Sequence, residues 1–227
     1  NGVTTNFVYK SKEEFSGVAP IFVTPNGENS IVIVSGLNNK LTKDEILQAE
    51  SEISKSTYLV CQLEIEVELS LIALRLAKKL GVSTILNPAP ARESLPNEIF
   101  QLTDIFCPNE SEAELLTGKK INSLDDVEIM AREFITAGAK SVIITLGEKG
   151  CYVLSNSIGK HIPASKVSVV DSTGAGDAFV GALAHFLDLG LDIFESADRA
   201  SRVATISVQG KGTQSSFPSK AELPADL

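Results

Sequence analysis

The sequence lacks a long hydrophobic run, since nowhere in its 227 residues do 18 uncharged apolar residues follow one another. A membrane-spanning helix needs about 20 such residues, so the sequence predicts no membrane span and no membrane partner. The N-terminus has no basic segment followed by an apolar core, which is the pattern of a secretory signal. It also has no initiator methionine, which predicts a fragment or a processed form of a longer protein.

Cysteine is scarce, with three residues at Cys61, Cys107 and Cys151. Their odd number, wide spacing and apolar surroundings predict reduced thiols in the core of a cytoplasmic protein, with the nucleus as the alternative location. No group of Cys and His residues has the spacing of a zinc site. We therefore expect neither a disulfide framework nor a structural zinc ion.

Positive charge is in short supply: 20 Lys and Arg stand against 29 Asp and Glu, for a formal net charge of −9 and a pI near 4.8. An acidic surface repels nucleic-acid phosphates and anionic lipids, so neither is an expected partner. A phosphorylated small ligand remains compatible, because backbone N–H groups bind phosphate without Lys or Arg. Hydrophobic residues make up 43% of the chain, as in a folded globular protein rather than a disordered one.

The first 40 residues have a pattern of their own. Apolar stretches at residues 18–24 and 30–35 flank Asn26-Gly27, and Asn-Gly between two β-rich runs is the strongest short hairpin signal. The sequence therefore predicts a partial β lid at residues 1–40, with a hairpin at about 18–35, and an α/β core at residues 41–227.

Strands and helices alternate through this core. Thr42 and Glu45 have the spacing of a capping box, which opens a helix to about residue 53. Further helices are predicted at residues 66–80, 97–102, 109–117, 123–137, 175–189 and 193–208, and strands at 57–61, 82–86, 104–107, 141–145, 151–154 and 167–170. The alternation predicts an α/β fold with a mostly parallel sheet and helices on both faces.

Ligands of such sheets bind at the carboxyl ends of the strands, where the loop at residues 171–177 is the most informative. Gly174, Ala175 and Gly176 let the backbone approach a ligand closely, and unpaired amides with the positive end of the helix dipole form an anion hole. Asp177, in the first helical turn, could take a proton from a hydroxyl group beside that hole. Spacing alone equally allows a tight turn whose aspartate only complements the dipole.

Two other phosphate-binding motifs do not fit. Gly174 and Gly176 begin like a dinucleotide-binding G-x-G-x-x-G, but Phe179 occupies the place of the third glycine, and the motif lies late in the chain. No G-x-x-x-x-G-K-[ST] sequence occurs, so a Walker-type phosphate loop is absent as well.

Residues 170–179, VDSTGAGDAF, closely resemble the signature of the ribokinase-like (PfkB) carbohydrate kinases. Four further segments resemble the same family in the same order: NPAPA at 87–91, PNESEAELLTG at 108–118, VIITLGEKG at 142–150 and GTQSSFP at 212–218. The resemblance runs from about Gly17 to the end of the chain. It implies the ribokinase-like fold and the transfer of the γ-phosphoryl group of MgATP to the 5-hydroxyl of D-ribose.

The resemblance also implies roles for single residues. Asp177 is the expected base and contacts the sugar, and the amides of residues 174–176 are the expected anion hole. Glu64 matches a sugar-contacting residue, although a solvated acid before a helix explains it equally well. The expected ATP-binding residues are Asn109, Thr145, Leu146, Gly147, Glu148, Lys149, Gly150, Gly176, Asp177 and Ser201.

Two cation sites are implied in the same way. Glu112 is expected to hold Mg²⁺ through water, since this ion keeps several waters and takes few protein ligands. From spacing alone, the Asn109–Glu112 pair is better explained as the first turn of a helix, with Asn109 as its N-cap. A monovalent cation, K⁺ in the family, is expected at Asp171, Thr173, Ser207, Gly210, Gly212 and Ser216.

Family members carry several tens of residues before the point where this sequence begins, and those residues hold most of the sugar-binding groups. Two functions are therefore expected: an active sugar kinase, or a truncated, catalytically silent nucleotide-binding remnant of the same fold. The family also implies a homodimer that pairs through the lid, whose open strand edges favour association.

Overall fold

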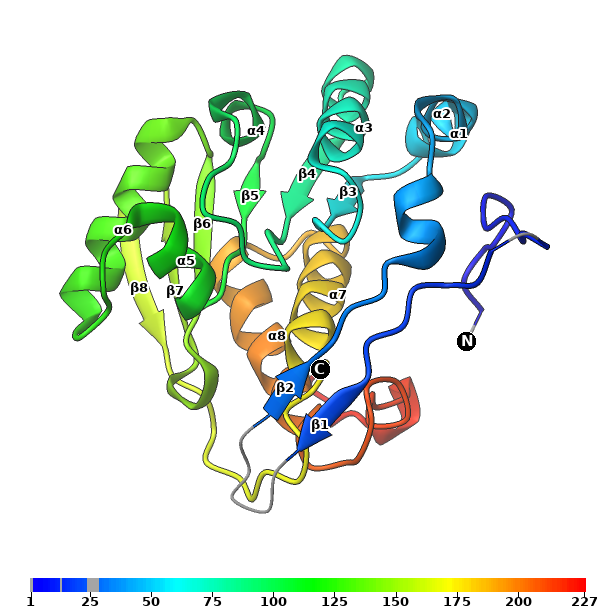
Figure 1. The fold of residues 1–227 in the computed structure, drawn as a ribbon. Helices are drawn as coiled ribbons and strands as arrows, with labels where there is room; N and C mark the ends of the chain where they lie inside the picture. The colour runs from blue at the N-terminus through cyan, green and yellow to red at the C-terminus, as the bar shows by residue number, and fades with distance from the viewer. Residues whose placement is uncertain (1, 13, 24–28) are drawn as a thin grey trace.

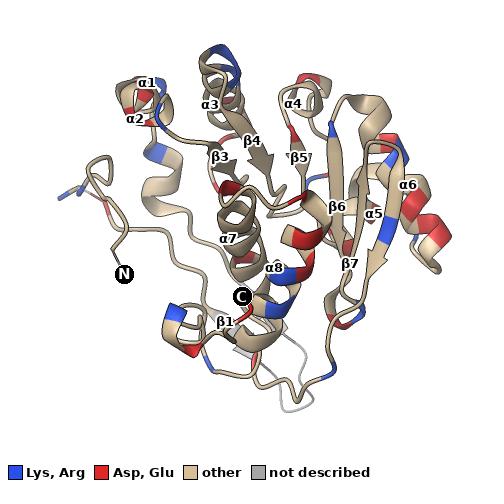
Figure 2. Cartoon of the chain, turned by 180° about the vertical axis from the view of Figure 1, so that it is seen from behind, with Lys and Arg blue, Asp and Glu red and all other residues tan. Residues whose placement is uncertain are grey.

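The computed structural model describes residues 2–12, 14–23 and 29–227. It shows a six-stranded sheet between two layers of helices, with a separate two-stranded sheet beside it (Figure 1). Figure 2 shows acidic positions on several helices, with lysine and arginine positions interspersed among them. None of the helices in these ranges is long and apolar enough to cross a membrane.

The small sheet is the predicted hairpin. Its strands β1 (Ile21–Val23) and β2 (Asn29–Ile31) pair antiparallel. Val18 and Val34 extend the ladder, each amide donating to the other's carbonyl at 2.9 Å. The hairpin is therefore confirmed, while its Asn26-Gly27 turn lies outside the described residues and the domain boundary at residue 40 stays a prediction.

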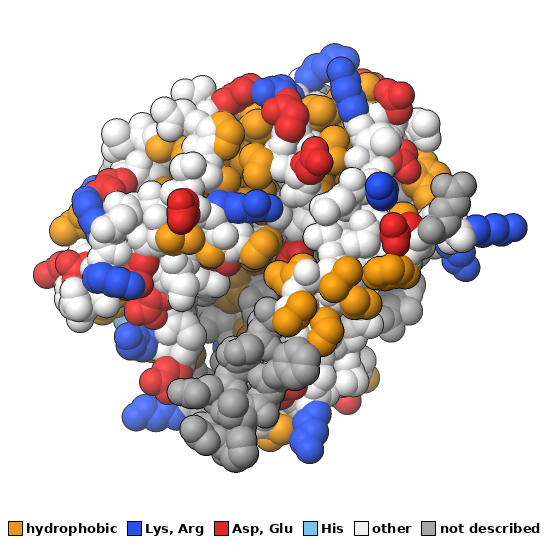
Figure 3. Space-filling view, viewed as in Figure 1, with side chains coloured by type: hydrophobic (Ala, Val, Ile, Leu, Met, Phe, Trp, Pro, Cys, Tyr) orange, Lys and Arg blue, Asp and Glu red, His pale blue; other side chains and the backbone are white. Residues whose placement is uncertain are grey.

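Exposed hydrophobic side chains accompany the hairpin. Val18, Val32, Ile33 and Val34 are each between 41% and 52% exposed. Figure 3 shows hydrophobic side chains gathered on one face of the molecule. The dimer predicted through the lid would cover this surface, and it stays a prediction.

The large sheet is mixed but mostly parallel. Its strands lie in the order β3 (Tyr58–Cys61), β4 (Ser83–Leu86), β5 (Ile105–Phe106), β6 (Ser141–Thr145), β7 (Cys151–Ser155) and β8 (Ile158–Ile162). The first four are parallel to one another, and β7 and β8 continue the sheet antiparallel. The predicted α/β class is confirmed.

The strand predicted at residues 167–170 is wrong, because the sheet ends on β8 and these residues belong to no strand. Asn156 and Ser157, with φ angles of 49° and 65°, form a two-residue turn that leads from β7 directly into β8. β8 gives little hydrophobic signal because residues 158–160 are exposed. The apolar Val167 and Val169 line a pocket instead.

The helices follow the sequence pattern with one interruption. They are α1 (Lys43–Gln48), α2 (Glu50–Ile53), α3 (Val67–Leu80), α4 (Asn97–Gln101), α5 (Glu110–Thr117), α6 (Leu124–Ala137), α7 (Ala175–Asp188) and α8 (Ile193–Ser207). The single helix expected from Thr42 to about residue 53 breaks at Ala49 into α1 and α2. Its capping box is confirmed: the Glu45 amide donates to Thr42 Oγ1 at 3.3 Å, and the Thr42 amide donates to Glu45 Oε2 at 2.8 Å.

Alternate strand residues face opposite helix layers. Leu86, Phe106 and Ile144 belong to a core that includes α3, α4 and α6. Ile85 and Ile143, their neighbours along the strands, belong to a second core with α7 and α8. Both faces of the sheet are thus covered, as predicted, and α7 and α8 lie together on one of them (Figure 1).

Asp104, just before β5, joins three elements at the end of the sheet where the parallel strands begin. Its Oδ1 pairs with the ammonium groups of Lys78 at 2.7 Å and Lys140 at 2.6 Å, and its Oδ2 accepts the Thr84 amide at 2.9 Å. Partial burial raises the pKa of Asp104, but these two ammonium groups and the Thr84 amide outweigh it and lower the pKa to about 2.

We expect Asp104→Asn to lower the free energy of unfolding by about 1–2 kcal/mol at neutral pH. The ionised carboxylate stabilises the fold above its unfolded pKa of 3.8, and this contribution is lost as the pH falls through the folded pKa of about 2. The difference between wild type and variant, measured by urea unfolding, should therefore shrink between about pH 5 and pH 2. Asp188→Asn, which removes an exposed carboxylate at the end of α7, is the control, and an equal loss in both variants would contradict the argument.

Candidate active site

The turn before α7 has a backbone that requires glycine. Gly174 is the N-cap of α7 with φ of 82°, in the left-handed region. A Cβ atom at this position would lie 3.1 Å from the carbonyl oxygen of Thr213 and 3.3 Å from the Phe217 ring. The turn and the C-terminal segment are therefore in close contact, and a side chain at residue 174 would separate them.

The first turn of α7 presents unpaired amides. The amides of Gly174, Gly176 and Asp177 donate to no acceptor in the described part of the chain, whereas the Ala175 amide donates to the Ser172 carbonyl at 3.2 Å. Two of the three predicted anion-hole amides are thus available, and the helix dipole adds partial positive charge there. The arrangement can bind a phosphoryl group.

Asp177 stands directly after these amides. Its side chain is exposed and has no hydrogen bond or ion pair with the rest of the described chain. Neighbouring atoms nevertheless remove part of its hydration, which raises the pKa of its carboxyl group. A carboxylate with a raised pKa and a free oxygen is suited to accept a proton from a hydroxyl.

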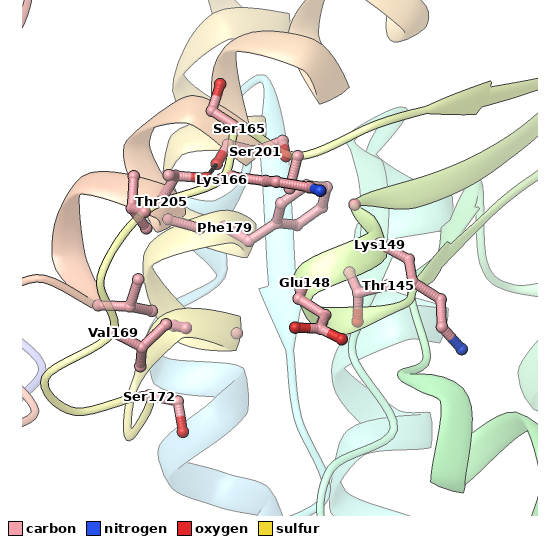
Figure 4. A pocket seen from close by; sticks show the side chains of 18 residues that line it. Thr145, Glu148, Lys149, Ser165, Lys166, Val169, Ser172, Phe179, Ser201 and Thr205 are labelled. Carbon is pink, nitrogen blue, oxygen red and sulfur yellow. Dashed lines mark hydrogen bonds between the residues drawn. The ribbon is translucent and has the colours of Figure 1, made fainter.

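Ala175 and Gly176 line a pocket of about 700 Å³ that opens between two walls (Figure 4). One wall is the segment after β6, where Thr145 and Gly150 flank the 3₁₀ turn Gly147–Lys149. The other wall comes from α7, α8 and residues 164–169. The pocket brings together eight of the predicted site residues: Thr145, Gly147, Glu148, Lys149, Gly150, Ala175, Gly176 and Ser201.

Several lining residues are not found by the sequence analysis: Ala164, Ser165, Lys166, Val167, Val169, Ser172, Phe179, Ala204, Thr205 and Val208. On α8, lining residues recur at 201, 204, 205 and 208, the spacing of one helix face. The sequence contains that spacing, but a helix face that lines a pocket has the same sequence pattern as one that packs against the core. Ser201 is 8% exposed, and its hydroxyl makes no hydrogen bond with the described chain, so it is free to contact a ligand.

Asn109 and Glu112 form a capping box at the start of α5. The Glu112 amide donates to Asn109 Oδ1, and the Asn109 amide donates to Glu112 Oε2, both at 2.8 Å. Burial raises the pKa of Glu112, and the Asn109 amide opposes this effect. The structural explanation of this pair is therefore confirmed. Neither residue lines the pocket, but Asn109 is bridged to the lining residue Thr145.

A magnesium ion is compatible with this pair. Glu112 Oε1 accepts no hydrogen bond from the described chain and is not among its fully buried unpaired atoms, so this oxygen retains access to solvent. The described residues contain no group of three or more His, Cys, Asp or Glu that could hold a metal. Mg²⁺ would therefore take most of its ligands from phosphate and water, which is its usual preference.

The residues expected to hold a monovalent cation form two hydrogen-bonded groups. Asp171 accepts a hydrogen bond from the Thr173 amide on Oδ1 and one from the Gly212 amide on Oδ2, each at 3.0 Å. These two bonds, together with a hydrogen bond from the Thr173 side chain, lower the pKa of Asp171. Ser216 Oγ donates to the Gly212 carbonyl, and the Gly210 amide donates to the Ser207 carbonyl. One carboxylate among backbone carbonyls is the oxygen donor set that suits a hard cation.

Leu146 and Glu64 also lie outside the pocket lining, as do Gly174 and Asp177. Leu146 is 4% exposed, its side chain belongs to the core, and its amide donates to the Gly150 carbonyl at 2.7 Å. Glu64 is exposed and lines a second recess of about 320 Å³, between α1, β3 and α3. No hydrogen bond or ion pair joins Glu64 to Asp177 in the described chain.

Comparison with known proteins gives consistent matches. The sequence matches the family described as pfkB family carbohydrate kinase over residues 1–220. It is 43% identical to a ribokinase of Mus musculus, over all of this chain and 72% of that protein, and 40% identical to a deoxyribokinase of Salmonella typhi, over 96% and 71%. Among solved structures, ribokinase from Thermotoga maritima is 37% identical with a TM-score of 0.80, over 91% of this chain and 67% of that one. Arabidopsis thaliana ribokinase, described as complexed with ribose and ATP, is 30% identical with a TM-score of 0.81, over 92% and 68%.

Proposed function

The chain belongs to the pfkB family of carbohydrate kinases, and from this membership we propose that it transfers the γ-phosphoryl group of MgATP to the 5-hydroxyl of D-ribose. One observation supports the proposal most directly. The free amides of Gly176 and Asp177 lie at the start of α7, where Gly176 lines the large pocket and the Asp177 carboxylate follows it.

The pocket lining combines backbone amides with polar and apolar side chains. The start of α7 supplies the amides, while Val169, Phe179, Ala204 and Val208 supply apolar surface. A nucleotide placed along the pocket would direct its phosphates to the amides and its base to the apolar wall. The unpaired Ser201 hydroxyl stands in that wall, where it can contact the base or the ribose of ATP.

The proposed reaction needs a base, an anion hole and a bound nucleotide. Asp177 accepts the proton of the sugar hydroxyl as its oxygen forms a bond to the γ-phosphorus. The bond from that phosphorus to the bridging oxygen breaks, and ADP leaves with the electron pair. The α7 amides stabilise the charge on the transferred group, which is the main task of a protein in phosphoryl transfer. Mg²⁺, held through water by Glu112, would neutralise phosphate charge.

We also propose a monovalent cation at the Asp171 network. Gly212 and Ser216, from the C-terminal segment, join this network to the turn that precedes Gly174. A cation bound to these oxygens would fix that turn, and so the anion hole, without touching the sugar.

The test of the proposed function is sugar-dependent ADP formation by the chain as it stands, with MgATP and K⁺ present. We expect turnover with ribose, and we expect lower turnover when choline replaces K⁺. 2-Deoxyribose is the second acceptor to assay, because two matched relatives are named deoxyribokinases. Preferred turnover of deoxyribose would change the assigned sugar. ATP binding without turnover of either sugar would favour the catalytically silent alternative.

A further inference from the structure

His161 makes a contact that the proposed reaction does not use. It lies on β8, opposite Tyr152 of β7, and its Nε2 atom is 2.7 Å from the carbonyl oxygen of Lys149. Lys149 belongs to the turn that forms one wall of the large pocket. His161 itself does not line the pocket. The carbonyl can only accept, so Nε2 must carry a proton.

A second observation places β8 directly against the same turn. Gly150 has φ of 91°, and a Cβ atom there would lie 2.0 Å from the Ile162 carbonyl oxygen and 2.6 Å from the Ala164 nitrogen. The end of the turn and the end of β8 are thus in backbone contact. The side chain of His161 and the backbone of Ile162 approach the turn from one strand.

The turn has few other attachments to the molecule. Its remaining backbone hydrogen bonds are local: the Lys149 amide donates to the Leu146 carbonyl, and the Gly150 amide donates to the Gly147 carbonyl. The ammonium group of Lys149 is 3.9 Å from the Glu110 carboxylate, and because the Lys149 side chain is 62% exposed this ion pair adds little. The bond from His161 is therefore the one short side-chain hydrogen bond that holds the turn's backbone from outside, in the described part of the chain.

We propose that His161 is a positioning residue for the nucleotide: by donating to the Lys149 carbonyl it fixes the turn that forms the nucleotide-facing wall. The inference rests on the proposed function only in that the large pocket binds ATP. His161 acts through Lys149 and touches neither the nucleotide nor the sugar. Its loss therefore weakens nucleotide binding and leaves the chemical step and the sugar site unchanged.

Three variants test the proposal. His161→Phe keeps a ring without a donor, and His161→Leu is a smaller side chain without a donor. His161→Gln keeps an N–H donor at a similar reach. Lys160→Gln changes an exposed neighbour on β8 and serves as the control. The measurements are the dissociation constant of ATP by calorimetry, the KM for ATP, the KM for the sugar, kcat, and the melting temperature of each variant.

We expect the dissociation constant and KM for ATP to rise about three- to tenfold in His161→Phe and His161→Leu, the range that loss of one hydrogen bond allows. We expect the sugar KM and kcat to stay within about twofold, and His161→Gln to restore ATP affinity. Unchanged ATP affinity in the donor-free variants would overturn the proposal, as would equal losses for ATP and sugar, failure of both variants to fold, or no rescue by glutamine.

Calorimetry separates this proposal from the proposed function. If the wild-type chain binds ATP but phosphorylates no sugar, the proposed reaction fails while the ATP affinities of the variants still decide the role of His161. If the wild-type chain phosphorylates ribose and His161→Phe binds ATP normally, the role of His161 fails alone. A wild-type chain that binds no ATP overturns both.

Discussion

Asp177→Asn is expected to lower kcat for sugar phosphorylation by about 10²–10⁴-fold, the usual contribution of a general base. The affinity for ATP and the free energy of unfolding should change little. The Asp177 side chain is exposed and has no partner in the described chain, so its replacement breaks no interaction that holds the fold. The variant therefore isolates the proton-accepting role of the carboxylate.

The pH dependence gives this prediction a second test. The pKa of Asp177 is raised above its ordinary value of 3.8 because neighbouring atoms remove part of its hydration. A base works in its ionised form, so wild-type kcat should fall as the pH drops through this raised pKa. The residual activity of Asp177→Asn should lack that acidic limb.

Asp188→Asn is the matched control, since it neutralises an exposed aspartate at the other end of the same helix. It should retain full activity. If Asp177→Asn kept more than about a tenth of wild-type kcat, or lost activity only in proportion to a loss of ATP binding, Asp177 would not be the base. The carboxylate would then be a first-turn residue that complements the helix dipole.

The sequence predicts those parts of the molecule that local chemistry determines. Thr42 and Glu45 cap α1 as their spacing indicates, because both partners lie within one helical turn. Gly81 and Gly118 end α3 and α5 with φ of 75° and 67°, a backbone conformation in which glycine is favoured. The glycine turn before α7 is predicted for the same reason, since its glycines and the α7 helix are adjacent in the chain.

The errors come from contacts between distant segments. Val167 and Val169 read as a strand because apolar residues lie close together there, but the pocket and not the sheet accounts for them. Ala204 and Val208 are predicted only as helix, and the other chain segments that line the pocket lie about 25 residues away in sequence or more. Leu146 stays a predicted ATP-binding residue, and its side chain belongs to the core.

Gly150→Ala is expected to lower the free energy of unfolding by about 3–5 kcal/mol, at the upper end of single-substitution effects. Gly150 has φ of 91° and ψ of −128°, a combination that L side chains rarely adopt. The added methyl group would stand 2.0 Å from the Ile162 carbonyl oxygen and 2.6 Å from the Ala164 nitrogen. Both are backbone atoms, one in the last residue of β8 and one just after the strand, so no side chain can move aside.

Gly147→Ala is the control that separates steric conflict from backbone preference, because it lies in the same turn with φ of 57° and meets nothing within 4 Å. The left-handed backbone alone should cost this variant about 1–2 kcal/mol. Urea unfolding of both variants gives the comparison, and ATP affinity should fall by at least about tenfold in Gly150→Ala, where the pocket wall must move. Equal losses in the two variants would mean that the turn can shift away from β8 at little cost. In that case neither Gly150 nor His161 would fix the wall of the nucleotide pocket.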